Sequence, residues 1–128
     1  MIFGVGTDLT LISRVDRLWV RYGEHFVDKI LMPVERERFD PARRAGNYLA
    51  KHFAVKEAFV KALGTGFRDG VSHHDVGYVQ DARSRPSLIY SPAMQQRLAA
   101  LGVVNGQVSL SDEDGRVLAF VVLERVAP

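Results

Sequence analysis

The feature that most constrains the fold of this chain is an apolar stretch over residues 53–63, which two glycines follow closely. Its spacing is helical and an Asp40-Pro41 start signal lies upstream, so the sequence predicts one long helix ending at Leu63, with Gly46 available for a bend. Gly64 is suited to close this helix in a left-handed conformation. Small side chains recur every four residues and let another element pack closely, at Ala54, Ala58 and Ala62.

The other segments predict shorter helices and several strands. Residues 2–8 favour a strand that ends at Asp8, because β-branched and aromatic residues alternate there with glycine. A helix over residues 13–22 should start with Ser13 as its N-cap and bury Val15, Leu18, Trp19 and Tyr22. Further helices are expected over residues 33–39 and 92–101, and strands over residues 76–80, 87–90, 107–111 and 117–123. Helices and strands do not alternate regularly, so the predicted class is α+β, with helices packed on a small, mostly antiparallel sheet.

Composition indicates one ordinary folded domain that spans residues 1–128, with 47% hydrophobic and 25% charged residues. The chain has no cysteine, which excludes disulfides, thiol catalysis and cysteine-ligated zinc, and fits a cytoplasmic location. No apolar run approaches the roughly 20 residues that a membrane span needs. We also expect no signal peptide, since the first ten residues lack a basic segment followed by an apolar one.

The net charge of +2 hides an uneven distribution. Residues 1–68 hold 12 Lys/Arg and 8 Asp/Glu, whereas residues 69–128 hold 5 and 7. Arg14, Arg17 and Arg21 fall at helical spacing and share one stripe. The basic half could therefore meet an anionic partner, either nucleic acid, a phosphate ligand or an acidic protein, or could simply be a solvated surface.

The long helix also carries the candidate chemistry. Phe53, Glu57 and Lys61 are four residues apart and share one face. Alone, Glu57 and Lys61 would form a routine ion pair worth about 0.2–0.5 kcal/mol. If Asp8 supplied a second carboxylate, the pair would suit Mg²⁺, which prefers oxygen ligands and keeps water positions for a phosphate substrate. General principles do not place Asp8 beside Glu57, and they favour a solvated loop over a metal site for residues 73–75.

Two sequence motifs carry a family resemblance. The first is Gly4-Val5-Gly6-Thr7-Asp8 with Arg14, and the second is Phe53-Ala54-Val55-Lys56-Glu57-Ala58 with Lys61 and Gly64-Thr65-Gly66. Together with Arg85-Pro86 and Val108-Ser109-Leu110-Ser111, they resemble the holo-acyl-carrier-protein synthases, the short bacterial-type 4′-phosphopantetheinyl transferases.

That resemblance implies an activity and partners. Members of the family transfer 4′-phosphopantetheine from coenzyme A to a serine of apo acyl carrier protein in a Mg²⁺-dependent reaction that supports fatty acid biosynthesis. Adenosine 3′,5′-bisphosphate leaves. The family assembles as a homotrimer with active sites at subunit interfaces.

The resemblance also implies residue roles. Asp8 and Glu57 would hold Mg²⁺, and Lys61 would neutralise the coenzyme A pyrophosphate. We expect Glu57 to accept the serine proton, directly or through a water on the metal. Gly64 and Gly66 would lie near the adenosine, and Pro86 would come from the neighbouring subunit's side. Arg14 would contact the carrier protein, and helical geometry adds Arg17 and Arg21.

Some positions differ from the usual family pattern. His52 stands where many members have an arginine that meets the coenzyme A 3′-phosphate. Either His52 would share that role with Arg44, Arg43 or Lys51, or coenzyme A would bind more weakly. Ser84 replaces a glycine before Arg85-Pro86. Three alternatives are a nucleic-acid-binding basic module, another Mg²⁺-dependent phosphotransfer enzyme, and a pseudoenzyme that keeps only an assembly role.

Overall fold

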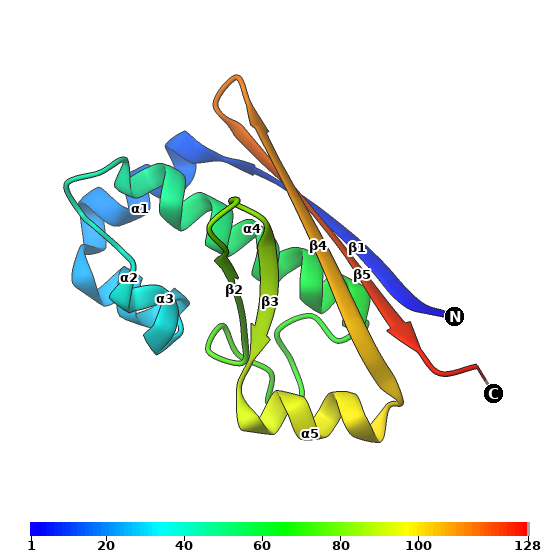
Figure 1. Ribbon diagram of the computed structural model, residues 1–128. Coiled ribbons are helices and arrows are strands. Elements are labelled where there is room, and N and C mark those ends of the chain that lie inside the picture. Colours follow the sequence, from blue (N-terminus) through cyan, green and yellow to red (C-terminus); the bar gives the residue numbers. More distant parts are fainter. Residues whose placement is uncertain (128) are drawn as a thin grey trace.

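The computed structural model describes residues 1–127, and Figure 1 shows the course of the chain. Within these described residues, five helices and five strands alternate irregularly, as the sequence predicts for an α+β fold. In chain order they are β1 (Ile2–Leu11), α1 (Ile12–Tyr22), α2 (Glu24–Ile30), α3 (Pro33–Glu37), α4 (Ala45–Leu63), β2 (Val76–Gln80), β3 (Pro86–Tyr90), α5 (Pro92–Ala100), β4 (Val103–Glu113) and β5 (Arg116–Arg125).

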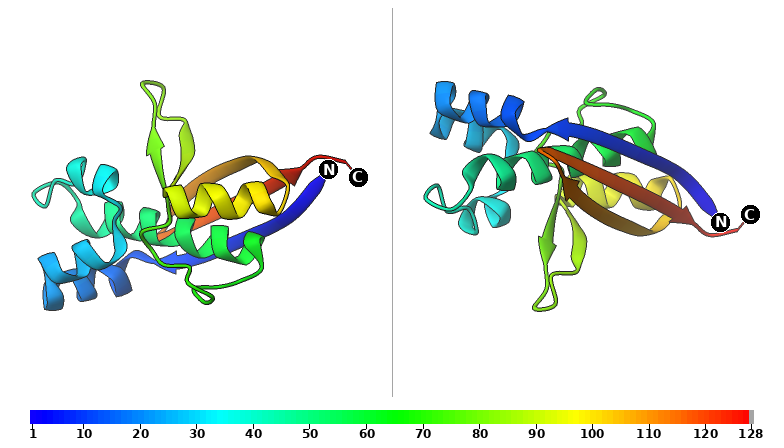
Figure 2. Two further views of the ribbon diagram at one scale, coloured as in Figure 1. Left: turned by 90° about the horizontal axis from the view of Figure 1, so that it is seen from below. Right: turned by 90° about the horizontal axis from the view of Figure 1, so that it is seen from above.

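The strands form two antiparallel sheets. One has the order β1-β5-β4, and the other is the β2–β3 hairpin. Helix α4 packs on one face of the three-stranded sheet, with its largest set of contacts to β1, and α1–α3 lie beside its N-terminal half (Figure 1). Figure 2 shows that the β2–β3 hairpin projects away from the body of the molecule. The predicted α+β class with a small antiparallel sheet is therefore confirmed.

Helix α4 and strand β1 approach each other without any side chain between their backbones. A Cβ atom at Gly6 would lie 2.0 Å from the carbonyl oxygen of Ala58, and one at Gly4 would lie 2.0 Å from that of Ala62. Real Cβ atoms do not come so close, so only glycine fits at these two positions. The predicted stripe of small residues thus has its partner in the glycines of β1.

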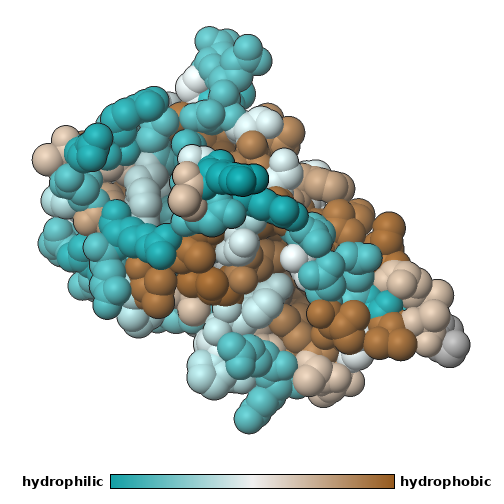
Figure 3. All heavy atoms as spheres, viewed as in Figure 1, coloured by the Kyte–Doolittle hydropathy of each residue, from teal (hydrophilic) through white to brown (hydrophobic). Residues whose placement is uncertain are grey.

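Side chains alternate along β1 because successive residues point to opposite faces of a strand. Gly6 and Thr10 are buried toward α4, and Asp8 lies between them on the same face. The outer face of the sheet is apolar and exposed on β1 and β5, at Val5, Leu9, Leu118 and Phe120. Figure 3 shows hydrophobic residues gathered along the strands on the right of the view, and hydrophilic ones over α1–α3 on the left.

Several predicted boundaries were wrong. Strand β1 continues to Leu11, so α1 starts at Ile12 and Ser13 lies inside the helix rather than at its N-cap. Of the four side chains expected on the buried face of α1, only Val15 is fully buried, while Leu18 and Tyr22 are exposed. Helix α4 starts at Ala45 because Arg44 takes a left-handed conformation with φ 47°.

No helix within residues 1–127 is both long enough and apolar enough to cross a membrane.

Candidate active site

The contact between β1 and α4 brings Asp8 to the exposed face of the helix. Asp8 follows Gly6 by two residues and is paired across the sheet with Ala119, so it points to the side on which α4 lies. The hydroxyl of Thr10 donates to Asp8 Oδ2 at 2.5 Å. This hydrogen bond holds the carboxylate, whose side chain is only 14% exposed.

Lys61 of α4 faces the same point on β1. Its ammonium group donates to the carbonyl oxygen of Thr7 at 3.0 Å and lies 3.4 Å from Asp8 Oδ1. Among the described residues Lys61 pairs with Asp8, and no ion pair with Glu57 is formed. The ion pair between Glu57 and Lys61 that the helical spacing allows is therefore replaced by a contact between α4 and β1.

Glu57 completes a group of two carboxylates and one ammonium. Its pKa is raised above the ordinary value, first by burial and then by the nearby negative charge of Asp8. The positive charges of Lys61 and Arg14 oppose this rise. The structure thus places Asp8, Lys61 and Arg14 within electrostatic reach of Glu57, so that two negative and two positive side chains meet at this point.

This donor set fits Mg²⁺. Carboxylate oxygens are ligands that Mg²⁺ prefers, and the ion commonly uses one or two carboxylates together with waters and substrate phosphates. Residues 1–127 contain no group of three or more His, Cys, Asp or Glu side chains that could hold a metal alone. Asp8 and Glu57 offer two carboxylates, so the other ligands of an ion held there would be waters or oxygens of a substrate.

The three arginines of α1 extend from this site along the helix surface. Arg14, the first, is close enough to lower the pKa of Glu57. Arg17 and Arg21 are exposed, and the Arg21 guanidinium lies over the Tyr22 ring at 5.3 Å. Next to the stripe, a groove of about 460 Å³ is lined largely by apolar side chains, among them Leu18, Tyr22, Phe26, Ile30 and Phe53.

The glycines after α4 form its C-terminal cap. Gly64 has φ 90° and Gly66 has φ 63°, which are left-handed values that favour glycine. The amides of Gly64, Thr65 and Gly66 all donate to the carbonyl oxygen of Val60, at 3.0–3.3 Å. Gly64 is exposed, so the same turn can cap the helix and also contact a bound ligand.

A basic cleft of about 480 Å³ lies at the N-terminal end of α4. Four basic side chains line it, and we call it the basic cleft: Arg38, Arg43, Arg44 and Lys51. His52 also lines the cleft, but it is 4% exposed and its ring lies between those of Tyr48 and Tyr78, at centroid distances of 4.1 and 4.2 Å. Burial lowers the pKa of His52, so its ring is not a ready source of positive charge.

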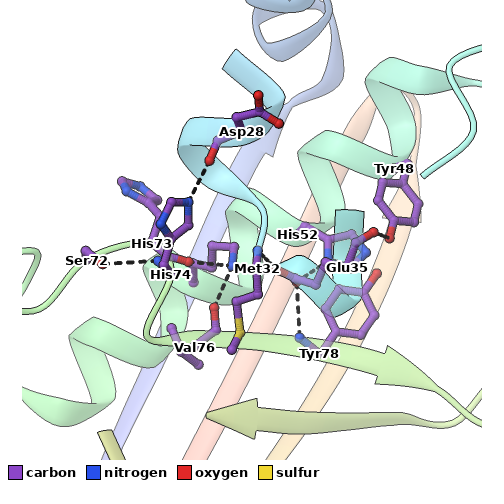
Figure 4. A network of polar contacts seen from close by, with 11 residues as sticks. Asp28, Met32, Glu35, Tyr48, His52, Ser72, His73, His74, Val76 and Tyr78 are labelled. Carbon is purple, nitrogen blue, oxygen red and sulfur yellow. Dashed lines mark hydrogen bonds and ion pairs between the residues drawn. The ribbon is translucent and has the colours of Figure 1, made fainter. Parts of the chain in front are cut away.

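His52 belongs to a buried polar network that the sequence analysis did not identify. Its Nδ1 atom contacts the carboxylate of Glu35, and the ammonium group of Lys56 lies 2.7 Å from Glu35 Oε1. Figure 4 shows this network beside β2. Lys56 was a charged residue within the apolar stretch, and that departure from the pattern was the signal that could have revealed it.

Residues 73–75 lie in a loop, as the sequence predicted, but the His73 side chain is partly buried rather than solvated. Its ring stacks on Phe67 with 3.9 Å between centroids, and burial lowers its pKa to about 4.

Pro86 is the first residue of β3, after Ser84, which takes a left-handed φ of 63°. It therefore lies at the outer end of the projecting hairpin (Figure 2).

A family model that describes the 4′-phosphopantetheinyl transferase superfamily matches residues 4–121. The chain belongs to this superfamily. It is 44% identical over 125 residues to a holo-acyl-carrier-protein synthase of Neisseria meningitidis, which covers 98% of this chain and 100% of that relative.

Solved structures of the superfamily share this fold. A crystal structure of the Neisseria meningitidis holo-acyl-carrier-protein synthase matches with a TM-score of 0.92 at 45% identity, over 98% of this chain and 100% of that one. The holo-acyl-carrier-protein synthase of Bacillus anthracis, solved in complex with CoA (3′,5′-ADP), matches with a TM-score of 0.79 at 30% identity, over 98% and 99% of the two chains.

Titration of Glu57 tests the proximity of the two carboxylates. Because Asp8 helps to raise the pKa of Glu57, Asp8→Asn should lower that pKa, and added Mg²⁺ should lower it in the unaltered protein. Asp16→Asn removes an exposed carboxylate elsewhere and should leave it unchanged. Carboxyl NMR measures each value, and a Glu57 pKa that is insensitive to Asp8 would contradict the arrangement.

The raised pKa of Glu57 also predicts how the stability of the fold changes with pH. A folded-state pKa above the unfolded value means that ionised Glu57 disfavours folding, so this group's contribution should favour folding increasingly as pH falls through its folded pKa. Glu57→Gln should consequently lose no stability at neutral pH.

Proposed function

We propose that this protein transfers 4′-phosphopantetheine from coenzyme A to a serine of apo acyl carrier protein and releases adenosine 3′,5′-bisphosphate. The observation that carries the proposal is the juxtaposition of Asp8, Glu57 and Lys61 on one exposed face. It matches the chemistry that the transfer needs, which is to position two substrates and to neutralise phosphate oxygens. We propose that residues 1–128 act as one domain, and the cysteine-free composition keeps the cytoplasm as the proposed location.

Asp8 and Glu57 would hold Mg²⁺ together with oxygens of the coenzyme A pyrophosphate. The ion would polarise the phosphoryl group and stabilise negative charge on the leaving oxygen. Asp8 is suited to this role because Thr10 fixes its orientation. Lys61, half-exposed and held against β1, presents a positive charge to the same pyrophosphate.

In the reaction, the serine oxygen of the carrier protein forms a bond to the β-phosphorus. The bond from that phosphorus to the oxygen shared with the α-phosphate breaks, and the electron pair leaves with adenosine 3′,5′-bisphosphate. Glu57 accepts the serine proton. A carboxylate placed beside the metal site can accept this proton directly or through a water that the metal holds.

The basic cleft is the proposed site of the coenzyme A 3′-phosphate. The usual arginine of the family is His52 here, and His52 is buried and bonded to Glu35. Arg44 and its basic neighbours supply the positive charge that a phosphate requires, and guanidinium groups bind phosphate through two parallel hydrogen bonds. Pro86 pairs with Gln80, which lines the cleft, and the Gly64–Gly66 cap of a neighbouring subunit would contact the adenosine beside them.

The arginine stripe of α1 is the proposed docking surface for the carrier protein. Arg14 lies beside the site, and Arg17 and Arg21 continue the stripe, so an acidic partner would be guided toward Glu57. The apolar groove beside the stripe could take an apolar side chain of the same partner. Charged residues around an apolar centre are the usual composition of a protein interface.

A homotrimer would cover the outer face of the sheet. Val5, Leu9, Leu118 and Phe120 are between 41% and 65% exposed there, and contiguous apolar patches of this kind mark interaction sites. Assembly through this face would also let a neighbouring hairpin bring its Pro86 to a site of another subunit.

Mass spectrometry of apo carrier protein tests the proposed reaction. Incubation with the protein, coenzyme A and Mg²⁺ should add one phosphopantetheine group to the carrier protein. Glu57→Gln should lower turnover by about 10²-fold or more, because a positioned base contributes that much. Its unfolding temperature should not fall. No transfer to any of several carrier proteins would reject the function, and wild-type turnover in the variant would remove Glu57 from the mechanism.

Two further variants in the same assay should affect different substrates. The double variant Arg17→Ala/Arg21→Ala should raise the KM for carrier protein and leave the KM for coenzyme A unchanged, and added salt should weaken its defect. Arg44→Ala should raise the KM for coenzyme A instead. Equal effects of either variant on both KM values would contradict the separate roles.

Light scattering tests the assembly. The particle mass should be three times the 14.3 kDa of one chain, and Leu9→Asp should yield smaller particles with little activity. A monomer with full turnover would exclude an active site shared between subunits.

A further inference from the structure

A charged network lies in the core on the side of α4 that faces away from β1. Lys56 and Glu35 are both 0% exposed, and His52 is 4% exposed. We call these three side chains the Glu35 network. It is unusual because Lys and Glu are almost never fully buried unless they are paired.

Lys56 connects α4 to the segment that precedes β2. Its ammonium group donates to Glu35 Oε1 at 2.7 Å, to the carbonyl oxygen of His73 at 2.7 Å and to that of Val76 at 2.5 Å. An ammonium group has three donors, and all three are used. Lys56 therefore fixes both ends of the turn between residues 73 and 76.

Glu35 connects α3 to β2 in the same way. Its carboxylate accepts from the amide of Met32 at 2.9 Å and from that of Tyr78 at 3.2 Å, and it contacts His52 Nδ1 (Figure 4). A Cβ atom at Gly77 would lie 2.5 Å from Glu35 Cδ, so β2 rests directly on the carboxylate. The position of the hairpin thus depends on the Glu35 network.

The charges within the network compensate one another. Burial alone would raise the pKa of Glu35, but the hydrogen bond with His52 and the positive charge of Lys56 leave it below the ordinary value. Replacing a buried ion pair by apolar side chains of similar volume is often neutral or stabilising. A gain in folding stability is thus a weak explanation for the Glu35 network. Fixing the positions of the segments that the network joins is a sufficient explanation.

The segments that Lys56 and Glu35 position are the ones that the proposed function assigns to the nucleotide. The chain between α4 and β2 begins with the Gly64–Gly66 cap and ends at the two carbonyl groups held by Lys56. The hairpin that Glu35 supports carries Pro86, and Tyr78 and Gln80 of the hairpin line the basic cleft. By contrast, the contact between β1 and α4 places Asp8, Glu57 and Lys61 without the network.

We propose that Lys56, with Glu35, is a positioning residue for coenzyme A: it holds the 64–76 segment and the β2–β3 hairpin where they bind the nucleotide. This inference rests on the proposed function. Lys56 does not touch the reacting atoms, since it is buried beneath the turn. It acts through backbone groups, so its loss should weaken nucleotide binding more than it slows the chemical step.

The test is the double variant Glu35→Gln/Lys56→Met, because Lys56→Met alone would leave a buried carboxylate without its partner. The double variant removes both charges at nearly constant volume. We expect its KM for coenzyme A to rise about tenfold or more, while turnover at saturating coenzyme A stays within about threefold of the original. Hydrogen exchange of residues 72–80 should become faster. The Kd for coenzyme A, measured by calorimetry, should rise in parallel with the KM.

Two more variants keep the proposal falsifiable if the double variant does not fold. Gly77→Ala pushes β2 off the carboxylate and leaves Lys56 intact, and it should show the same rise in KM. Leu123→Ala is the control: it opens a cavity in β5, away from the network, and should lower the unfolding temperature without raising the KM. A folded double variant, or a folded Gly77→Ala protein, with the original KM and Kd would overturn the proposal.

The outcomes also separate this inference from the proposed function. Failure of the unaltered protein to transfer phosphopantetheine would reject the function itself. Normal transfer by the unaltered protein, with coenzyme A binding that is insensitive to the network variants, would reject only the role of Lys56 and leave the function standing.

Discussion

The direct contact between the backbones of β1 and α4 is the interaction on which the rest of this structure depends. Gly4 and Gly6 lie against the carbonyl groups of Ala62 and Ala58, with no room for a Cβ atom at either glycine. Because side chains alternate along a strand, the same register that buries Gly6 turns Asp8 toward the helix. Asp8 then meets Lys61 and Glu57, which come from a segment some fifty residues later.

Helix α4 carries two sets of charged residues that serve different purposes. Lys56 and Glu57 are adjacent, so they point about 100° apart around the helix axis. Glu57 shares an accessible face with Lys61, where charges can meet a substrate. Lys56 enters the core, where its charge is balanced by Glu35 and organises the backbone of the neighbouring segments. One helix thus connects the proposed reaction centre to the proposed nucleotide-binding elements.

Much of this arrangement could be predicted from the sequence because local patterns carry it. The long helix, its stripe of alanines and the left-handed Gly64 all follow from spacing and composition, and the motifs of the family identified Asp8, Glu57 and Lys61 as partners. The boundaries of α1 and α4 were less predictable. Hydrogen bonds to β5 extend β1 to Leu11, and the left-handed conformation of Arg44 delays the start of α4. No short sequence pattern predicts either boundary.

The Glu35 network was missed for a different reason. Glu35, Lys56 and the carbonyl group of Val76 are distant in sequence, and a lysine in an amphipathic helix is ordinarily solvated. The apolar neighbours of Lys56 could have marked it as buried, but only the tertiary structure shows which groups it contacts in the core. The burial of His52 was not predicted for the same reason, because its place between Tyr48 and Tyr78 depends on the placement of the hairpin.

Turnover of Gly6→Ala tests the central claim most directly, namely that the approach of β1 to α4 builds the active site. The variant keeps every charged residue and adds one methyl group. Assayed below its unfolding temperature at saturating substrates, it should lose about 10²-fold in turnover, since displacement of a catalytic group by about 1 Å can cost that much. Gln96→Ala, on the exposed face of α5, should stay close to the original rate. A folded Gly6→Ala protein with unchanged turnover would contradict the account.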